Sequence, residues 1–145
     1  MKANIYKGRT RNIALAVKKS KDLCLLKEIA DFLVPQVKEN DIIVPAPNHN
    51  GFADYTLEIA KIVSEFTGAR TSDCLKVSPH IPLHDFRNQK LKMFLCGTIP
   101  NGKIFLLDNV IDTGKTFFTA KKLIPNIRPL MYATTNKVQE VKNER

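Results

Sequence analysis

Two kinds of hydrophobic pattern follow one another along the chain, and together they predict alternating strands and helices. Short continuous apolar runs are typical of strands that are buried on both faces of a sheet. Runs of this kind occupy residues 13–17, 41–45, 74–77, 92–96, 103–107 and 129–133. Since strands separated by helices form a mainly parallel sheet, we expect an α/β fold with helices on both faces of the sheet.

Three segments between these runs place apolar residues three or four positions apart, which is the spacing of a buried helix face. The first helix is predicted to begin with Ser20 as its N-cap and to end near Pro35. The second covers residues 52–66 and stops at Gly68, and the third covers residues 117–123.

The 145 residues are predicted to form one domain over residues 1–145. Residues 1–12 are polar and basic and are predicted to form an arm or a small hood, whereas the charged residues 137–145 are predicted to fray. Residues 78–90 hold prolines and histidines without a clear period, so we predict a long loop there. Loops of that length in a compact domain are usually functional or mobile.

The formal net charge of +9 favours anionic partners such as phosphorylated small molecules. Nucleic acid is possible but not favoured, because the cations are spread along the chain and are not interleaved with aromatic side chains. No apolar run reaches the roughly 18 residues of a membrane span, and residues 1–7 lack a signal-like apolar stretch. We therefore expect a cytoplasmic protein that does not enter a membrane.

The three cysteines, Cys24, Cys74 and Cys96, are odd in number and widely spaced. A disulfide framework or a zinc knuckle needs paired and regularly spaced cysteines. We expect reduced and mostly buried thiols instead.

The most informative segment is residues 104–116, with the sequence Ile-Phe-Leu-Leu-Asp-Asn-Val-Ile-Asp-Thr-Gly-Lys-Thr. A buried strand ending at Leu107 is predicted to deliver Asp108 and Asn109, after which a short turn leads into a helix. The first turn of a helix presents unpaired backbone N–H groups and the positive end of the helix dipole. Gly114 permits a close approach of the backbone to a ligand, and threonine hydroxyls on either side add donors. The segment therefore predicts a site for a phosphate monoester.

Gly-Lys-Thr at residues 114–116 also ends the nucleotide-binding P-loop, which requires a second glycine five residues before its last one. That position is Asn109 in this chain, so the sequence does not favour an ATPase loop. A generic strand-turn-helix unit without a ligand is the other alternative.

At these residues the chain resembles the type I phosphoribosyltransferases. The fingerprint of that family is four apolar residues, two usually acidic residues, two apolar residues, then Asp/Thr, Thr/Ser, Gly, a small residue or Lys, and Thr/Ser. Residues 104–116 match this fingerprint along its whole length. The resemblance implies a Rossmann-like fold and a transferase that moves the phosphoribosyl group of 5-phosphoribosyl 1-diphosphate (PRPP) and releases diphosphate.

The resemblance also implies roles for single residues. Asp108 and Asn109 would contact the ribose hydroxyls, and Asp112 would lie near the incoming base or amine, so these three form the expected catalytic group. The 5′-phosphate would be held by Asp112, Thr113, Gly114, Lys115 and Thr116. Asn109 departs from the usual acidic pair, because an amide brings no negative charge to stabilise a cationic ribose.

In the same family a loop after an earlier strand binds the diphosphate. Residues 41–51, Asp-Ile-Ile-Val-Pro-Ala-Pro-Asn-His-Asn-Gly, occupy that place, and they weakly resemble the competence-associated, amidophosphoribosyltransferase-like branch. The backbone N–H groups of residues 48–51 could form an anion nest there, or the segment could be a plain strand-to-helix turn. The expected diphosphate contacts in this loop are Ala46, Pro47, Asn48 and His49.

Residues 78–90 would then be the lid that closes over the diphosphate and excludes water. The expected cationic contacts are Arg87 and Lys90 in the lid and Lys76 at the end of the preceding strand.

A zinc site at His80 and His84 is not expected, because Pro82 disfavours a helical pair and no third ligand stands nearby. We expect no metal held by the protein alone, and Mg²⁺ carried in by PRPP.

Three functions stay open on the sequence alone. The first is an enzyme that transfers the phosphoribosyl group to a nucleobase or an amine. The second is a non-catalytic regulator that binds PRPP or a nucleotide and contacts nucleic acid through its basic surface, and the third is an adaptor with a vestigial site. A base-binding hood could come from residues 1–20, where Tyr6 is the obvious aromatic. Family members are often dimers, so a homodimer is expected.

Overall fold

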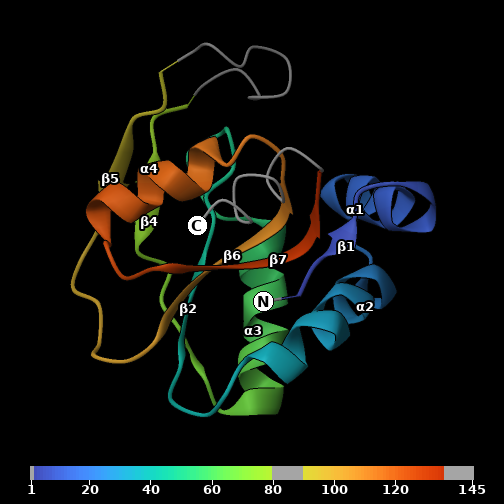
Figure 1. Cartoon of the computed structure of the whole chain (residues 1–145), viewed down its shortest axis with the longest axis horizontal. Helices are drawn as coiled ribbons and strands as arrows, with labels where there is room; N and C mark the ends of the chain where they lie inside the picture. The colour runs from blue at the N-terminus through green and yellow to red at the C-terminus, as the bar shows by residue number, and fades with distance from the viewer. Residues whose placement is uncertain (1, 80–89, 136–145) are drawn as a thin grey trace.

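The strand β6 (Ile104–Ile111) lies at the centre of the fold because its apolar residues are buried on both faces. Ile104 and Leu106 belong to one hydrophobic cluster, and Phe105 and Leu107 belong to the other. This is the alternation expected of a strand with a covering layer on each side. The computed structural model in Figure 1 describes residues 2–79 and 90–135.

Five parallel strands form the main sheet, in the order β1-β7-β6-β2-β3. Besides β6, the strands are β1 (Asn4–Ile5), β2 (Ile42–Pro45), β3 (Arg70–Thr71) and β7 (Arg128–Thr134). The expectation of a mainly parallel sheet in an α/β fold is confirmed. The short edge strand β3 was not predicted, since two residues leave no pattern in the sequence.

Helices cover both faces of this sheet (Figure 1). On one face pack α1 (Gly8–Ser20), α2 (Leu23–Leu33) and α3 (Tyr55–Thr67), with the short 3-10 helix η1 (Val34–Gln36) after α2. On the other face packs α4 (Lys115–Leu123). A separate antiparallel pair, β4 (Leu75–Val77) and β5 (Met93–Leu95), lies beside α4.

The predictions of the second and third helices and of the strands other than the first are confirmed to within a few residues. The α3 helix ends at Gly68, whose φ of 81° lies in the left-handed region that glycine favours. The predicted end of the central strand is wrong, because pairing with β2 stops at Leu107 while pairing with β7 continues to Ile111. The polar pair at residues 108 and 109 therefore lies within the strand.

The predicted strand over residues 13–17 is wrong, because these residues are part of a helix. Residues 4 and 5 form β1 beside β7, and residues 8–20 form the helix α1. A five-residue apolar run fits a strand or a helix, and here only Ile13, Ala14 and Val17 are fully buried, at helical spacing.

Ser20 is not the N-cap of α2, because it is the last residue of α1. The cap is Asp22, whose carboxylate accepts the N–H of Cys24 at 2.8 Å. Both Ser and Asp are good caps, so the sequence alone did not separate positions two residues apart.

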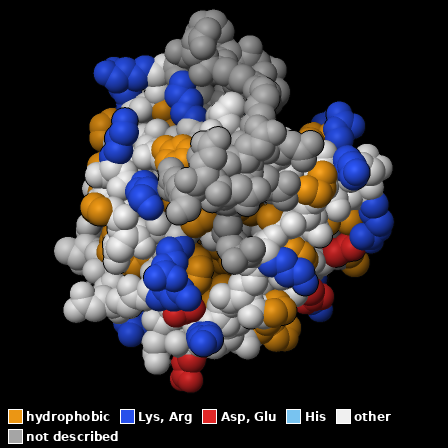
Figure 2. Space-filling view, viewed as in Figure 1, with side chains coloured by type: hydrophobic (Ala, Val, Ile, Leu, Met, Phe, Trp, Pro, Cys, Tyr) orange, Lys and Arg blue, Asp and Glu red, His pale blue; other side chains and the backbone are white. Residues whose placement is uncertain are grey.

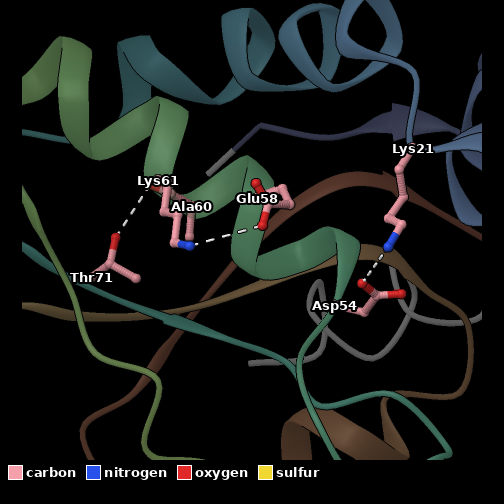
Figure 3. Close-up of polar contacts among 6 residues, drawn as sticks. All are labelled: Lys21, Asp54, Glu58, Ala60, Lys61 and Thr71. Atoms are coloured by element: carbon pink, nitrogen blue, oxygen red, sulfur yellow. Dashed lines mark hydrogen bonds and ion pairs between the residues drawn. The ribbon is translucent and has the colours of Figure 1, made fainter.

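Two of the polar contacts in Figure 3 join α3 or the loop before it to neighbouring elements. The ammonium of Lys21, just after α1, lies 3.0 Å from a carboxylate oxygen of Asp54, just before α3. The hydroxyl of Thr71 in β3 donates to the carbonyl oxygen of Ala60 in α3 at 3.3 Å. The first contact ties α1 to the loop that precedes α3, although an exposed ion pair contributes at most about 1 kcal/mol.

Some predictions fall outside the described residues. These are most of the loop at 78–90 and the frayed tail at 137–145. Within residues 2–79 and 90–135, no helix is long and apolar enough to cross a membrane.

Candidate functional site

A cleft of about 650 Å³ opens at the carboxyl ends of the parallel strands. Its walls come from α1, from the loop after β2, from the end of β6 with the turn into α4, and from Thr135 after β7. Ligands of open α/β sheets bind at this edge, because the loops and helix N-termini that follow the strands converge there. The volume lies in the range of small-molecule sites.

The turn at residues 112–116 lines this cleft, so the structure brings the five predicted phosphate contacts together. Gly114 has a φ of 82° and directly precedes α4. A Cβ atom on Gly114 would lie 2.7 Å from the ring of Phe118, so this position excludes any other side chain unless the ring moves. The N-terminus of α4 therefore lines the cleft through Lys115, Thr116 and Phe117, where a helix has backbone N–H groups without partners in the helix.

Two hydroxyl groups hold the shape of this turn. The hydroxyl oxygen of Thr113 accepts the backbone N–H of Lys115 at 3.3 Å. The hydroxyl of Thr135 lies 3.0 Å from a carboxylate oxygen of Asp112 and donates to it. Thr135, the residue that follows β7, thereby positions the Asp112 carboxylate at the cleft wall.

Asp108 also lines the cleft, as predicted. Asp108 is partly buried, and its carboxylate accepts the backbone N–H of Asn109 at 2.8 Å. Burial raises the pKa of Asp108 to about 6, and this rise is opposed by the Asn109 N–H and by the charge of Lys18. A carboxyl group that is hard to ionise in this cleft is suited to bind ligand hydroxyls or a cationic centre.

Asn109, predicted to contact ribose, does not line the cleft, although it is next to Asp108. Neighbouring residues of a strand point to opposite faces, so the Asn109 side chain points away from that of Asp108. Its side chain is fully buried and donates to the carbonyl oxygen of Ala14 at 2.9 Å. Its Oδ1 atom has no hydrogen-bond partner within the described part of the chain. The amide thus connects the central strand to α1.

The loop after β2 lines the cleft through Ala46, Pro47, Asn48 and His49. The hydroxyl of Thr56 donates to the Ala46 carbonyl oxygen at 2.7 Å and holds the beginning of the loop against α3.

The anion nest suggested for residues 48–51 does not form. The N–H of Asn48 donates to Phe52 O at 2.8 Å, and that of Gly51 to Asn48 O at 2.9 Å. The N–H of His49 donates to the side-chain oxygen of Asn48 at 2.8 Å. Turn hydrogen bonds therefore occupy three of the four amides on which the expected nest depended.

Two of the three predicted cationic contacts, Lys76 and Lys90, do not line the cleft. Lys76 pairs with Asp73 at 2.9 Å and lies over the ring of Phe52, outside the cleft lining. Lys90 is exposed and is not part of the lining. Arg87 lies outside the described residues, as do both histidines of the loop.

Sequence reasoning missed the basic residues of the cleft, Arg11 and Lys18, which both lie on α1. They are seven residues apart and so share one face of the helix, together with the cleft-lining Ala14. The spacing was visible in the sequence, but a predicted strand at residues 13–17 concealed it. The aromatic residue proposed for a hood, Tyr6, also lines the cleft.

Positive charge predominates around the site. Figure 2 shows Lys and Arg side chains over both the α1 side and the α4 side of this face.

Tyr55 lies in the cleft wall, and the pKa of its phenol is raised above the ordinary value by burial and by the nearby charge of Asp108. Among residues 2–79 and 90–135, no group of three or more His, Cys, Asp or Glu side chains could hold a metal ion.

Comparison with known proteins shows the fold. No family model matches the chain, and no curated protein matches it. Among solved structures, the Helicobacter pylori xanthine-guanine-hypoxanthine phosphoribosyltransferase is similar with a TM-score of 0.51. The similarity covers 80% of this chain and 77% of that chain at 14% sequence identity. The expected phosphoribosyltransferase-type fold is confirmed, and at this identity the likeness concerns the fold alone.

Gly114→Ala is expected to destabilise the protein more than Gly97→Ala. Both glycines have positive φ angles, 82° and 88°, but a Cβ at Gly97 meets no atom within 4 Å. The extra cost at Gly114 should be about 1–3 kcal/mol, the usual range for overpacking. Urea denaturation of both variants measures the difference, and equal costs would show that Phe118 does not restrict the turn.

Asp108→Asn is expected to stabilise the protein above pH 7. The pKa of Asp108 is raised from 3.8 to about 6, so the folded state binds this proton more tightly than the unfolded state. The free energy of unfolding therefore falls by up to about 3 kcal/mol as pH rises through this interval. The amide that replaces the carboxyl group cannot ionise, so the variant should lose this part of the pH dependence. Denaturation at pH 4.5 and 7.5 tests it, and a variant less stable than the parent at pH 7.5 would contradict the burial of an ionised Asp108.

Proposed function

We propose that this protein binds PRPP in the cleft and transfers its phosphoribosyl group to a nucleobase or an amine, with release of diphosphate. The observation that carries the proposal is the position of the 112–116 turn. The turn leads into the N-terminus of α4 at the wall of a cleft that is large enough for a small molecule. Asp108 lies at the same cleft wall, on the strand β6 that precedes the turn. A phosphate group and a ribose hydroxyl are the partners that these two features suit.

The proposed binding mode follows from the donors present. The N–H groups of Thr116 and Phe117 in the first turn of α4 and the hydroxyls of Thr113 and Thr116 bind the 5′-phosphate. Asp108 accepts hydrogen bonds from the ribose hydroxyls, and its charge stabilises positive charge that develops on the sugar. Asp112, held by Thr135, lies beside the incoming base or amine. Rate enhancement would come mainly from positioning and from this electrostatic arrangement.

The diphosphate needs cations, because the loop at residues 46–51 offers few free amides. Arg11 and Lys18 face the cleft from α1 and are the described residues that supply this charge from the wall opposite the phosphate turn. Their side chains replace, in this proposal, the lid contacts expected from the sequence. Ala46 to His49 then shape the wall beside the diphosphate.

Mg²⁺ fits this site only as an ion carried by the ligand. The cleft offers the carboxylates of Asp108 and Asp112 and no larger cluster of oxygen ligands within the described residues. Mg²⁺ commonly binds through substrate phosphates, water and one or two carboxylates, which matches that donor set. When bound, it would neutralise charge on the diphosphate, and Asp108 is the residue best placed to contact it.

A non-catalytic regulator that binds PRPP or a nucleotide is the second candidate. The burial of Asn109 against α1 favours it, because the cleft then contains one carboxylate at this place instead of an acidic pair. Stabilisation of a cationic ribose would be weaker with one charge. The basic surface seen in Figure 2 is compatible with additional contacts to nucleic acid.

Turnover separates the two candidates. PRPP with Mg²⁺ is incubated with single nucleobases and amines, and mass spectrometry follows the phosphoribosyl product and PRPP. A product from any acceptor supports the transferase. Saturable PRPP binding without a product supports the regulator, and the absence of binding at millimolar PRPP contradicts both.

Thr116→Val is expected to weaken the binding of ribose 5-phosphate by about 10-fold or more, because a hydrogen bond to a charged group contributes about 1.5–3 kcal/mol. Thr119→Val is the matched control. Thr119 lies in the same helix outside the cleft lining, where its hydroxyl donates to the Lys115 carbonyl oxygen. Isothermal titration calorimetry measures both affinities, and equal losses would show that the turn is not the phosphate site.

Arg11→Ala is expected to weaken the binding of PRPP by about 10-fold and that of ribose 5-phosphate by less than about 3-fold, because the second ligand lacks the diphosphate. Arg9→Ala is the control, since Arg9 lies on the same helix, pairs with Glu28 and is absent from the cleft lining. Titrations at low salt give the four affinities. Equal effects of Arg11→Ala on the two ligands would place the diphosphate elsewhere.

A further inference from the structure

We propose that Cys74 and Cys96 form a redox-active dithiol that closes to an intramolecular disulfide when a hydroperoxide oxidises it. This inference is independent of the function proposed above. It concerns the strand pair β4–β5, which lies outside the main sheet.

The strand register places the two cysteines opposite one another. Leu75 pairs with Leu95 in the antiparallel ladder, so Cys74 and Cys96 are the next opposed positions at its end. The backbone N–H of Cys96 donates to the carbonyl oxygen of Cys74 at 2.7 Å, which continues the pairing to these residues. Opposed residues of a hydrogen-bonded pair have Cα atoms about 5.5 Å apart and side chains on the same face. That separation lies within the range of about 4.4–6.8 Å that disulfides span.

The two thiols have different environments, which assigns them different roles. Cys74 is buried with Leu75 and Ala46 in the cluster beneath α4, and burial raises the pKa of its thiol. Cys96 is exposed and so meets a dissolved oxidant first.

The chemistry balances in two steps. The Cys96 thiolate attacks a hydroperoxide, which leaves as an alcohol or as water after protonation, and Cys96 becomes a sulfenic acid. The Cys74 thiolate then attacks the Cys96 sulfur, and the sulfenic oxygen leaves as water. The protein loses two hydrogen atoms, and the hydroperoxide is reduced by two electrons.

The third cysteine provides an internal control. Cys24 is exposed on α2, which packs on the opposite face of the main sheet from the cluster that contains Cys74. It therefore cannot bond to either of the other thiols within one molecule of this fold.

The experiment treats the full, reduced chain with hydrogen peroxide, alkylates the remaining thiols under denaturing conditions and maps the peptides by mass spectrometry. A peptide pair linked through Cys74 and Cys96, released by dithiothreitol, is the expected result. The closed loop should also raise the melting temperature of the oxidised parent by a few degrees. Cys24→Ser should keep both effects, and Cys96→Ser should abolish both.

Two results would overturn the proposal. One is overoxidation of Cys96 to the sulfinic acid while Cys74 remains fully alkylatable. The other is a linkage of Cys96 only to cysteines of other molecules, which a disulfide-linked dimer on non-reducing electrophoresis would reveal.

Discussion

The change from apolar to polar residues within one buried strand is the constraint on which the structure depends. β6 is apolar on both faces up to Leu107, and this fixes it at the centre of the sheet between two layers of helices. Because the strand continues to Ile111, it carries Asp108 into the cleft at the sheet edge. The carboxyl group loses hydration there, and its pKa rises to about 6. Ionisation of Asp108 is therefore unfavourable in the folded protein, and a ligand that donates hydrogen bonds or brings positive charge to the carboxylate would offset this cost.

The second wall of the cleft depends on α1, which packs on the sheet through Ile13, Ala14 and Val17 and is also held by polar contacts. Asn109 donates to the Ala14 carbonyl oxygen, and Lys21 pairs with Asp54 beyond the end of the helix. The amide at position 109 therefore has a structural explanation. A carboxylate there would oppose the Ala14 carbonyl oxygen, whereas an amide donates to it, and the same bond holds the helix that carries Arg11 across from the phosphate turn.

The sequence allowed the strands β2, β6 and β7, the helices α3 and α4, and the turn at residues 112–116 to be predicted, because each has a strong local pattern. The turn at 112–116 follows a fully apolar strand, and Gly114 has a steric reason to be glycine. The predictions failed where local patterns are ambiguous or where pairing decides. Residues 13–17 fit a strand or a helix, and the hydrogen bonds that occupy the amides of residues 48–51 depend on the exact turn conformation. The basic face of α1 was missed as a consequence of the first ambiguity.

The most direct test of the central claim is an NMR titration of the ¹⁵N-labelled protein with ribose 5-phosphate. If the turn into α4 binds the phosphate, the backbone amides of residues 113–117 should show the largest shifts, and these should saturate together. Saturation with the largest shifts at another surface, or no saturable shift at millimolar ligand, would contradict the account.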